Sequence, residues 1–115
     1  MAASYRVTIR EGPRVEREPF DDIDGALAAL ERRGRELERS ARARPVKTVL
    51  GRSYDPMQQV LARLELSGRG VRAGVDVRGD GSSEAFTGRL RRRIVEQGDG
   101  ESPYDALRRT LASPR

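Results

Sequence analysis

Apolar and charged residues alternate along the stretch from Gln59 to Val95, and tight turns separate the alternating runs. A period of two is typical of half-buried antiparallel strands. The pattern therefore predicts an antiparallel sheet with one apolar face that helices must cover. The apolar positions of the first two runs are Val60, Ala62, Leu64 and Leu66, then Val71, Ala73, Val75 and Val77.

Residues 4–10 show the same alternation, with Tyr5, Val7 and Ile9 on one face and Arg6 and Arg10 among the residues on the other. A turn at 11–13 leads to a highly charged run at 14–18, which predicts a short edge strand protected by its charges against strand addition. Residues 46–50 predict a further strand. Because a helix separates it from strand 4–10, we expect those two strands to pair in parallel through a right-handed crossover.

The span 84–95 fits two structures, because Phe86, Leu90 and Ile94 are four residues apart and share a face in either a helix or a strand. Thr87 and Gly88 weaken a helix, and the preceding sequence at 79–82 is typical of a hairpin connection. A strand is favoured, with Phe86 pointing inward. In such a strand Arg92 falls on the apolar side, so we expect the strand to end, bulge or twist there.

Two helices are predicted. The longer one covers about 21–42, capped by Asp21 or Asp22, with Gly34 on its apolar stripe as a point of close approach to the sheet. Glu38 and Arg42 form an i,i+4 pair on this helix. A short helix at about 103–111 has Ser102 as its cap, Pro103 at its first position and Asp105 at its third. The stripe of the long helix consists of Ile23, Leu27, Leu30, Gly34, Leu37 and Ala41.

These elements define an α+β fold. We expect a mainly antiparallel sheet of four or five strands, with the long helix packed on one face and the short C-terminal helix beside it. Neither internal repeats nor a low-complexity linker interrupts the 115 residues, so a single domain over residues 1–115 is expected. The second face of the sheet would remain open and carry arginines and acids.

The composition argues against several classes of function. The chain has neither cysteine nor histidine, which removes thiolate chemistry, the commonest general base and the commonest transition-metal ligand. Serines without such partners are not activated nucleophiles, and the glycine-containing turns match no phosphate-binding motif. We therefore expect a protein that is not an enzyme and needs no cofactor or metal. The absence of an apolar run of membrane-spanning length or of a signal sequence predicts a cytoplasmic protein that does not enter membranes.

The net charge is +5, and Lys47 is the only lysine among 23 basic residues. Codon usage in a GC-rich genome produces such an arginine bias by itself. The alternative is a functional basic face, since arginine grips phosphate with two parallel hydrogen bonds and stacks on bases. Glu65 and Asp76 share that face, so a solvated surface of internal ion pairs is also consistent. The candidate binding residues are Arg63, Arg72, Arg78, Arg89, Arg91 and Arg93.

The predicted order of strand, helix, strands and helix resembles that of small ribosome-associated hibernation factors. Its helix, three strands and helix resemble the double-stranded-RNA-binding domain. In that domain a lysine-rich phosphate clamp opens the last helix, where this chain has Ser102, Pro103, Tyr104 and Asp105. The resemblance therefore concerns element order and carries over no site residue.

Two functional hypotheses follow. The first is a non-catalytic module that binds RNA, DNA or another polyanion through the arginine-rich face. The second is a protein-interaction or self-association module, such as a homodimer, that docks through arginine–carboxylate pairs.

Overall fold

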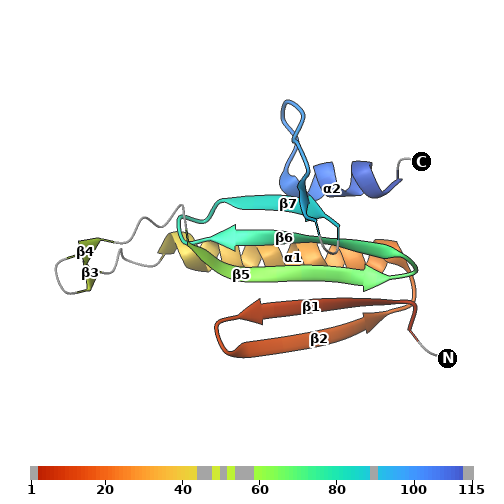
Figure 1. The fold of residues 1–115 in the computed structure, drawn as a ribbon, viewed down its shortest axis with the longest axis horizontal. Helices are drawn as coiled ribbons and strands as arrows, with labels where there is room; N and C mark the ends of the chain where they lie inside the picture. Colours follow the sequence, from red (N-terminus) through yellow and green to blue (C-terminus); the bar gives the residue numbers. More distant parts are fainter. Residues whose placement is uncertain (1–2, 44–47, 50–51, 54–58, 89–90, 113–115) are drawn as a thin grey trace.

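The computed structural model describes residues 3–43, 48–49, 52–53, 59–88 and 91–112. Its main body is an antiparallel sheet with a long and a short helix, which confirms the predicted α+β class (Figure 1). The sheet has six strands rather than four or five, in the order β2-β1-β5-β6-β7-β8. Its strands are β1 (Tyr5–Glu11), β2 (Arg14–Phe20), β5 (Val60–Gly68), β6 (Val71–Arg78), β7 (Ser83–Thr87) and β8 (Arg93–Ile94).

The parallel crossover predicted for residues 46–50 is wrong where the structure describes them. β3 (Thr48–Val49) pairs antiparallel with β4 (Arg52–Ser53) in a separate two-stranded sheet. Residues 46, 47 and 50 lie outside the described part of the chain. The physical reason is that β1 has no vacant edge, since β2 and β5 pair antiparallel along its two sides.

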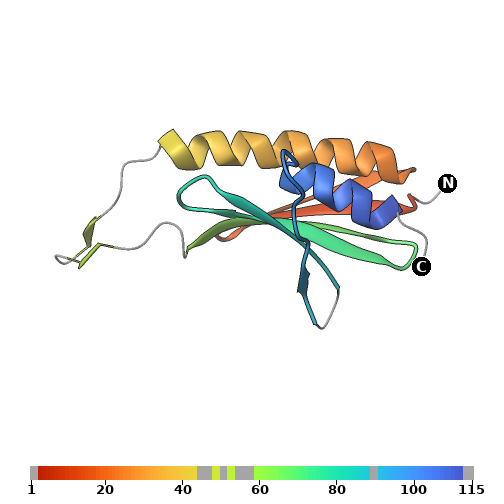
Figure 2. The same cartoon turned by 90° about the horizontal axis from the view of Figure 1, so that it is seen from above.

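The preference for a strand at 84–95 is confirmed, but the span contains two strands. β7 leaves the sheet after Thr87, and β8 returns antiparallel to it, with Phe86 opposite Ile94. The expected break near Arg92 thus takes the form of a chain reversal. Both strands turn away from the helices at this end of the sheet (Figure 2).

The helices begin where the capping residues predict. In α1 (Ile23–Ala43), the Asp22 Oδ1 atom accepts a 2.6 Å hydrogen bond from the Gly25 amide. In α2 (Pro103–Ala112), the Asp105 amide donates to the Ser102 hydroxyl, and the Asp105 carboxylate accepts from the Ser102 amide. Neither α1 nor α2, the two helices of the described residues, is long and apolar enough to cross a membrane.

Both helices cover the same face of the sheet (Figure 2). The core lies between them and the alternating apolar residues of β1, β5 and β6. Its largest completely buried side chains are Leu30, Leu64, Leu66, Val75, Val77 and Leu107. The apolar stripes of the helices and the apolar face of the sheet therefore pack into one layer. The second face of the sheet is not covered by any element of the described residues.

Gly34 does make a close approach, but its neighbour is α2 rather than the sheet. A methyl group added at Gly34 would lie 2.1 Å from the Tyr104 hydroxyl oxygen and 2.7 Å from the ring carbon that bears it. Tyr104 is 2% exposed and contributes to the core. The glycine on the buried stripe thus makes room for the tyrosine that joins the two helices.

Candidate functional site

The open face is the side of the six-stranded sheet that the helices do not cover. Strand register assigns its residues, since cross-strand partners point to the same side. Thr8 pairs with Glu65, Glu65 with Gly74, and Gly74 with Phe86, all on the side opposite Leu64 and Val75. The charged members are Arg6, Arg10, Arg17, Arg63, Glu65, Arg72, Asp76, Arg78 and Glu84, to which Arg92 is added through its contact with Phe86.

Every acid of the open face is held by an arginine of the same face. Arg63 makes a two-pronged contact with Asp76, with hydrogen bonds of 2.7 and 3.1 Å. That hydrogen bonding raises the pKa of Arg63 against the opposing effect of burial. The other pairs are Arg10 with Glu65 at 2.9 Å and Arg78 with Glu84 at 2.8 Å.

Four arginines of the open face remain without an ion pair within the described part of the chain: Arg6, Arg17, Arg72 and Arg92. All four side chains are exposed. We call them the unpaired arginines. The sequence allowed either a basic face or a surface of internal ion pairs, and the open face contains both. Some of its arginines are paired with acids, and others carry uncompensated positive charge.

The sequence-predicted site residues separate into three groups. Arg63 and Arg78 are engaged with acids, and Arg72 is one of the unpaired arginines. Arg89 lies outside the described residues. Arg91 and Arg93 are exposed, but Arg93 pairs with Thr87, whose partner Ala73 belongs to the core side. Arg93 was expected on the same face as Arg72, and the structure places it on the opposite side of the sheet.

The expectation that Phe86 points into the core is also wrong. Val75 pairs with Ala85, so the smaller side chain enters the core and Phe86 lies on the open face. When the inward-facing position of a strand is displaced by one residue, every side chain of that strand points to the opposite face. Thr87 and Arg93 therefore also lie on the face opposite to the one that an inward-pointing Phe86 would give them. Phe86 is nevertheless 6% exposed, because other side chains of the open face cover its ring.

Arginines surround the Phe86 ring. The guanidinium carbon of Arg92 lies 4.5 Å from the ring centroid and that of Arg63 lies 5.8 Å from it, which are cation–π contacts. Below the ring, a methyl group at Gly74 would lie 2.6 Å from the Phe86 Cζ atom, so the glycine lets the ring lie flat on the sheet. Phe86 thus anchors the guanidinium of an unpaired arginine.

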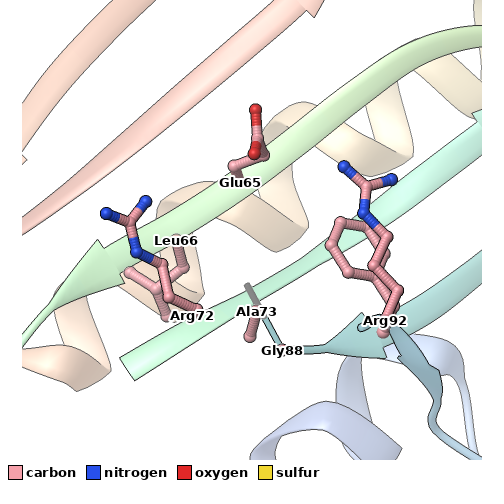
Figure 3. A pocket seen from close by; sticks show the side chains of 7 residues that line it. Glu65, Leu66, Arg72, Ala73, Gly88 and Arg92 are labelled. Atoms are coloured by element: carbon pink, nitrogen blue, oxygen red, sulfur yellow. The ribbon is translucent and has the colours of Figure 1, made fainter. Parts of the chain in front are cut away.

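A small pocket of about 50 Å³ opens beside this stack. Figure 3 shows the side chains of Arg72 and Arg92 standing on either side of it, with Glu65 on β5 between them. Its lining is completed by Leu66, Ala73, Phe86 and Gly88. The pocket therefore combines two cations, one carboxylate and an aromatic ring.

Sequence reasoning missed Arg6, Arg17 and Arg92 as site residues. The signal for Arg6 was present, since the alternation of residues 4–10 already separated it from Val7 and Ile9. What was lacking was the knowledge that β1 lies beside β5, which no local pattern specifies. Arg92 was assigned by strand alternation to the apolar side, and the reversal after Thr87 brings it onto Phe86 instead.

A second polar cluster lies between the helices and the sheet. The Tyr104 hydroxyl donates a 2.5 Å hydrogen bond to Glu38 Oε2, and the Ser83 hydroxyl donates a 2.7 Å bond to the same atom. Burial, followed by the hydrogen bond to the Glu38 carboxylate, raises the pKa of Tyr104 far above its usual value. Glu38 does not pair with Arg42, which instead donates to the Gly81 carbonyl at 3.2 Å. The cluster connects α1, α2 and β7.

Within the described ranges, no group of three or more carboxylates is arranged to hold a metal ion. Comparisons of the chain with protein-family models, with curated proteins and with solved structures find no match. The open face is therefore the feature of the protein that points to a function.

Proposed function

We propose that this protein is a non-catalytic module that binds nucleic acid through the open face of its sheet. The observation that supports this is the charge left over after internal pairing. All three acids of the open face are engaged by arginines, and the four unpaired arginines remain exposed. Arginine binds phosphate groups with a planar fork of donors, and phosphate contacts supply most of the sequence-independent affinity for nucleic acids.

The extent of the face suits a polymer. Arg17 lies on β2 at one edge of the sheet, and Arg92 lies over Phe86 of β7, four strand intervals away. At roughly 4.8 Å per interval these arginines span about 19 Å. At about 3.4 Å per nucleotide of a helical strand, that distance corresponds to roughly six nucleotides.

The same pairing argues against docking of a second copy through this face. Its acids are occupied within the chain, so a second copy would bring arginines against arginines, and like charges placed opposite each other are unfavourable. An interaction or self-association module remains the second hypothesis. It predicts a particle mass above that of the 12.8 kDa chain at low and moderate salt, which static light scattering measures.

Fluorescence anisotropy with labelled single-stranded RNA, single-stranded DNA and duplex RNA, at 50 and 200 mM salt, tests the proposal. Non-specific nucleic-acid binding has a Kd of roughly 1–100 µM at physiological salt. Four phosphate contacts predict that affinity falls by about 50- to 150-fold between the two salt concentrations, because each contact releases counterions. Absence of binding to all three probes at 50 mM salt would refute the proposal.

A further inference from the structure

The pocket beside Phe86 places a carboxylate next to two of the unpaired arginines. Glu65 lines the pocket together with Arg72 and Arg92. The Glu65 carboxylate can accept a hydrogen bond, which a group with N–H donors supplies and a phosphodiester does not. The pocket can therefore contact a part of a nucleic acid that the surrounding arginines alone do not contact.

The geometry of Glu65 leaves an acceptor for such a donor. Its Oε1 atom accepts the 2.9 Å hydrogen bond from the Arg10 Nε–H, and this contact fixes the carboxylate in place. Carboxylate oxygens can accept more than one hydrogen bond, so Glu65 retains accepting capacity toward the pocket. In nucleic-acid recognition, Glu and Asp accept hydrogen bonds from the N4 amino group of cytosine.

The guanidinium of Arg92 offers a stacking surface. Its guanidinium carbon lies 4.5 Å from the centroid of the Phe86 ring, and this cation–π contact restricts a long, exposed side chain. Unpaired bases stack on aromatic rings and on the planes of arginine guanidinium groups. Phe86 thus holds the Arg92 guanidinium beside the pocket, where a base can reach it.

The size of the pocket fits a single ring. Its volume is about 50 Å³. At roughly 10–15 Å³ for each water centre, it accommodates about four water molecules, which occupy about 120 Å³ in the liquid. That is the scale of one six-membered base.

We propose that this pocket binds one cytosine base of a single-stranded nucleic acid, stacked on Arg92 over Phe86 with its amino group donating to Glu65 and Arg72 beside its phosphate. The inference rests on the proposed function of the open face and adds a strand type and a base preference to it. A base within a duplex is stacked on its neighbours on both faces and cannot also stack on Arg92, so duplexes cannot use the pocket. Uracil presents a carbonyl oxygen where cytosine presents the amino group, and that oxygen would face the carboxylate of Glu65.

The test is a competition titration at 50 mM salt with octamers of cytidine and of uridine. Loss of one hydrogen bond to a charged group predicts that the cytidine octamer binds at least about tenfold more tightly. In Glu65→Gln the cytidine-to-uridine ratio should fall below about twofold, because the amide offers a donor as well as an acceptor. Glu84→Gln is the matched control, since it removes an acid of the same face outside the pocket and should preserve the ratio.

The outcomes separate the two proposals. Equal affinity for the two octamers, or a preference that survives Glu65→Gln, overturns the cytosine pocket. If binding is then still salt-sensitive, the open face keeps its proposed function. If neither octamer binds at 50 mM salt, the pocket proposal fails, and the proposed function fails with it when duplex RNA does not bind either. A second variant, Phe86→Leu, should weaken binding of the cytidine octamer through loss of the ring that orients Arg92. Unchanged affinity of that variant would contradict the stacking arrangement.

Discussion

Gly34 of α1 makes room for the Tyr104 side chain of α2. The tyrosine ring occupies the space that a side chain at position 34 would need, and its hydroxyl donates a hydrogen bond to the carboxylate of Glu38. A helix-interior glycine costs about 1 kcal/mol relative to alanine, and here the cost is offset by the packing it permits. The glycine could be recognised in the sequence as a point of close approach. Its partner could not, because Tyr104 is 70 positions away and only the tertiary fold brings it near.

Gly34→Ala should therefore destabilise the protein by about 1–3 kcal/mol, as overpacking of a buried contact outweighs the gain in helix propensity. Chemical denaturation followed by circular dichroism measures the difference. Ser40→Ala, on the exposed side of the same helix, is the control and should change stability by less than about 0.5 kcal/mol. A stabilised Gly34→Ala variant would show that the Tyr104 contact is not as close as described.

The raised pKa of Tyr104 makes stability depend on alkaline pH. The folded state keeps the phenol protonated, while the unfolded chain ionises with the ordinary tyrosine pKa of 10.0, so the folded state binds more protons above that pH. The contribution of Tyr104 is present in full below pH 10 and declines above it, by about 1.4 kcal/mol per pH unit. Urea unfolding between pH 9 and 11 should show this decline in the natural protein and a smaller one in Tyr104→Phe. Parallel declines in both would contradict the assignment.

At the scale of elements, α1 and the strands β1, β5 and β6 could be predicted because each carries a long, regular pattern. Helix caps gave the starts of both helices. The side chains of β7 and β8 could not be assigned to the correct face from the sequence. Ala85 and Phe86 are adjacent and both apolar, so alternation allows either to point into the core, and the larger one was expected there. The structure places the smaller residue inward and covers the larger with arginines. The pairing of β3 failed for another reason, since no local signal shows that both edges of β1 are taken.

Leu30→Ala tests α1 as the main cover of the sheet. Leu30 is 1% exposed, and removal of its side chain should cost about 2–5 kcal/mol through lost burial and the cavity left behind. Thermal unfolding by circular dichroism gives the result. Glu36→Ala, which is exposed on the same helix, serves for comparison. An unchanged melting temperature for Leu30→Ala would contradict the packing of this helix against the sheet through Leu30.

At the scale of the whole molecule, the two faces of the sheet have opposite roles. Helices bury one face and thereby stabilise the domain, while the other keeps a positive charge that exceeds what its own acids neutralise. The sequence predicted an arginine-rich face and three of its members correctly, Arg63, Arg72 and Arg78. It could not show which arginines are neutralised, because that depends on cross-strand neighbours. It also could not predict the Phe86 stack and its pocket, which require the reversal between β7 and β8.

The central claim is that the unpaired arginines, rather than net charge, bind nucleic acid. The most direct test compares Arg72→Gln/Arg92→Gln with Arg32→Gln/Arg39→Gln by anisotropy, using a single-stranded octamer at 50 mM salt. Both double variants lower the net charge from +5 to +3, but Arg32 and Arg39 are exposed on α1, which covers the other face. The open-face variant should bind at least tenfold more weakly and show a salt slope lower by about 1.4, while the helix variant should stay within about threefold of the natural protein. Equal losses in both variants would contradict the claim and assign the binding to overall charge.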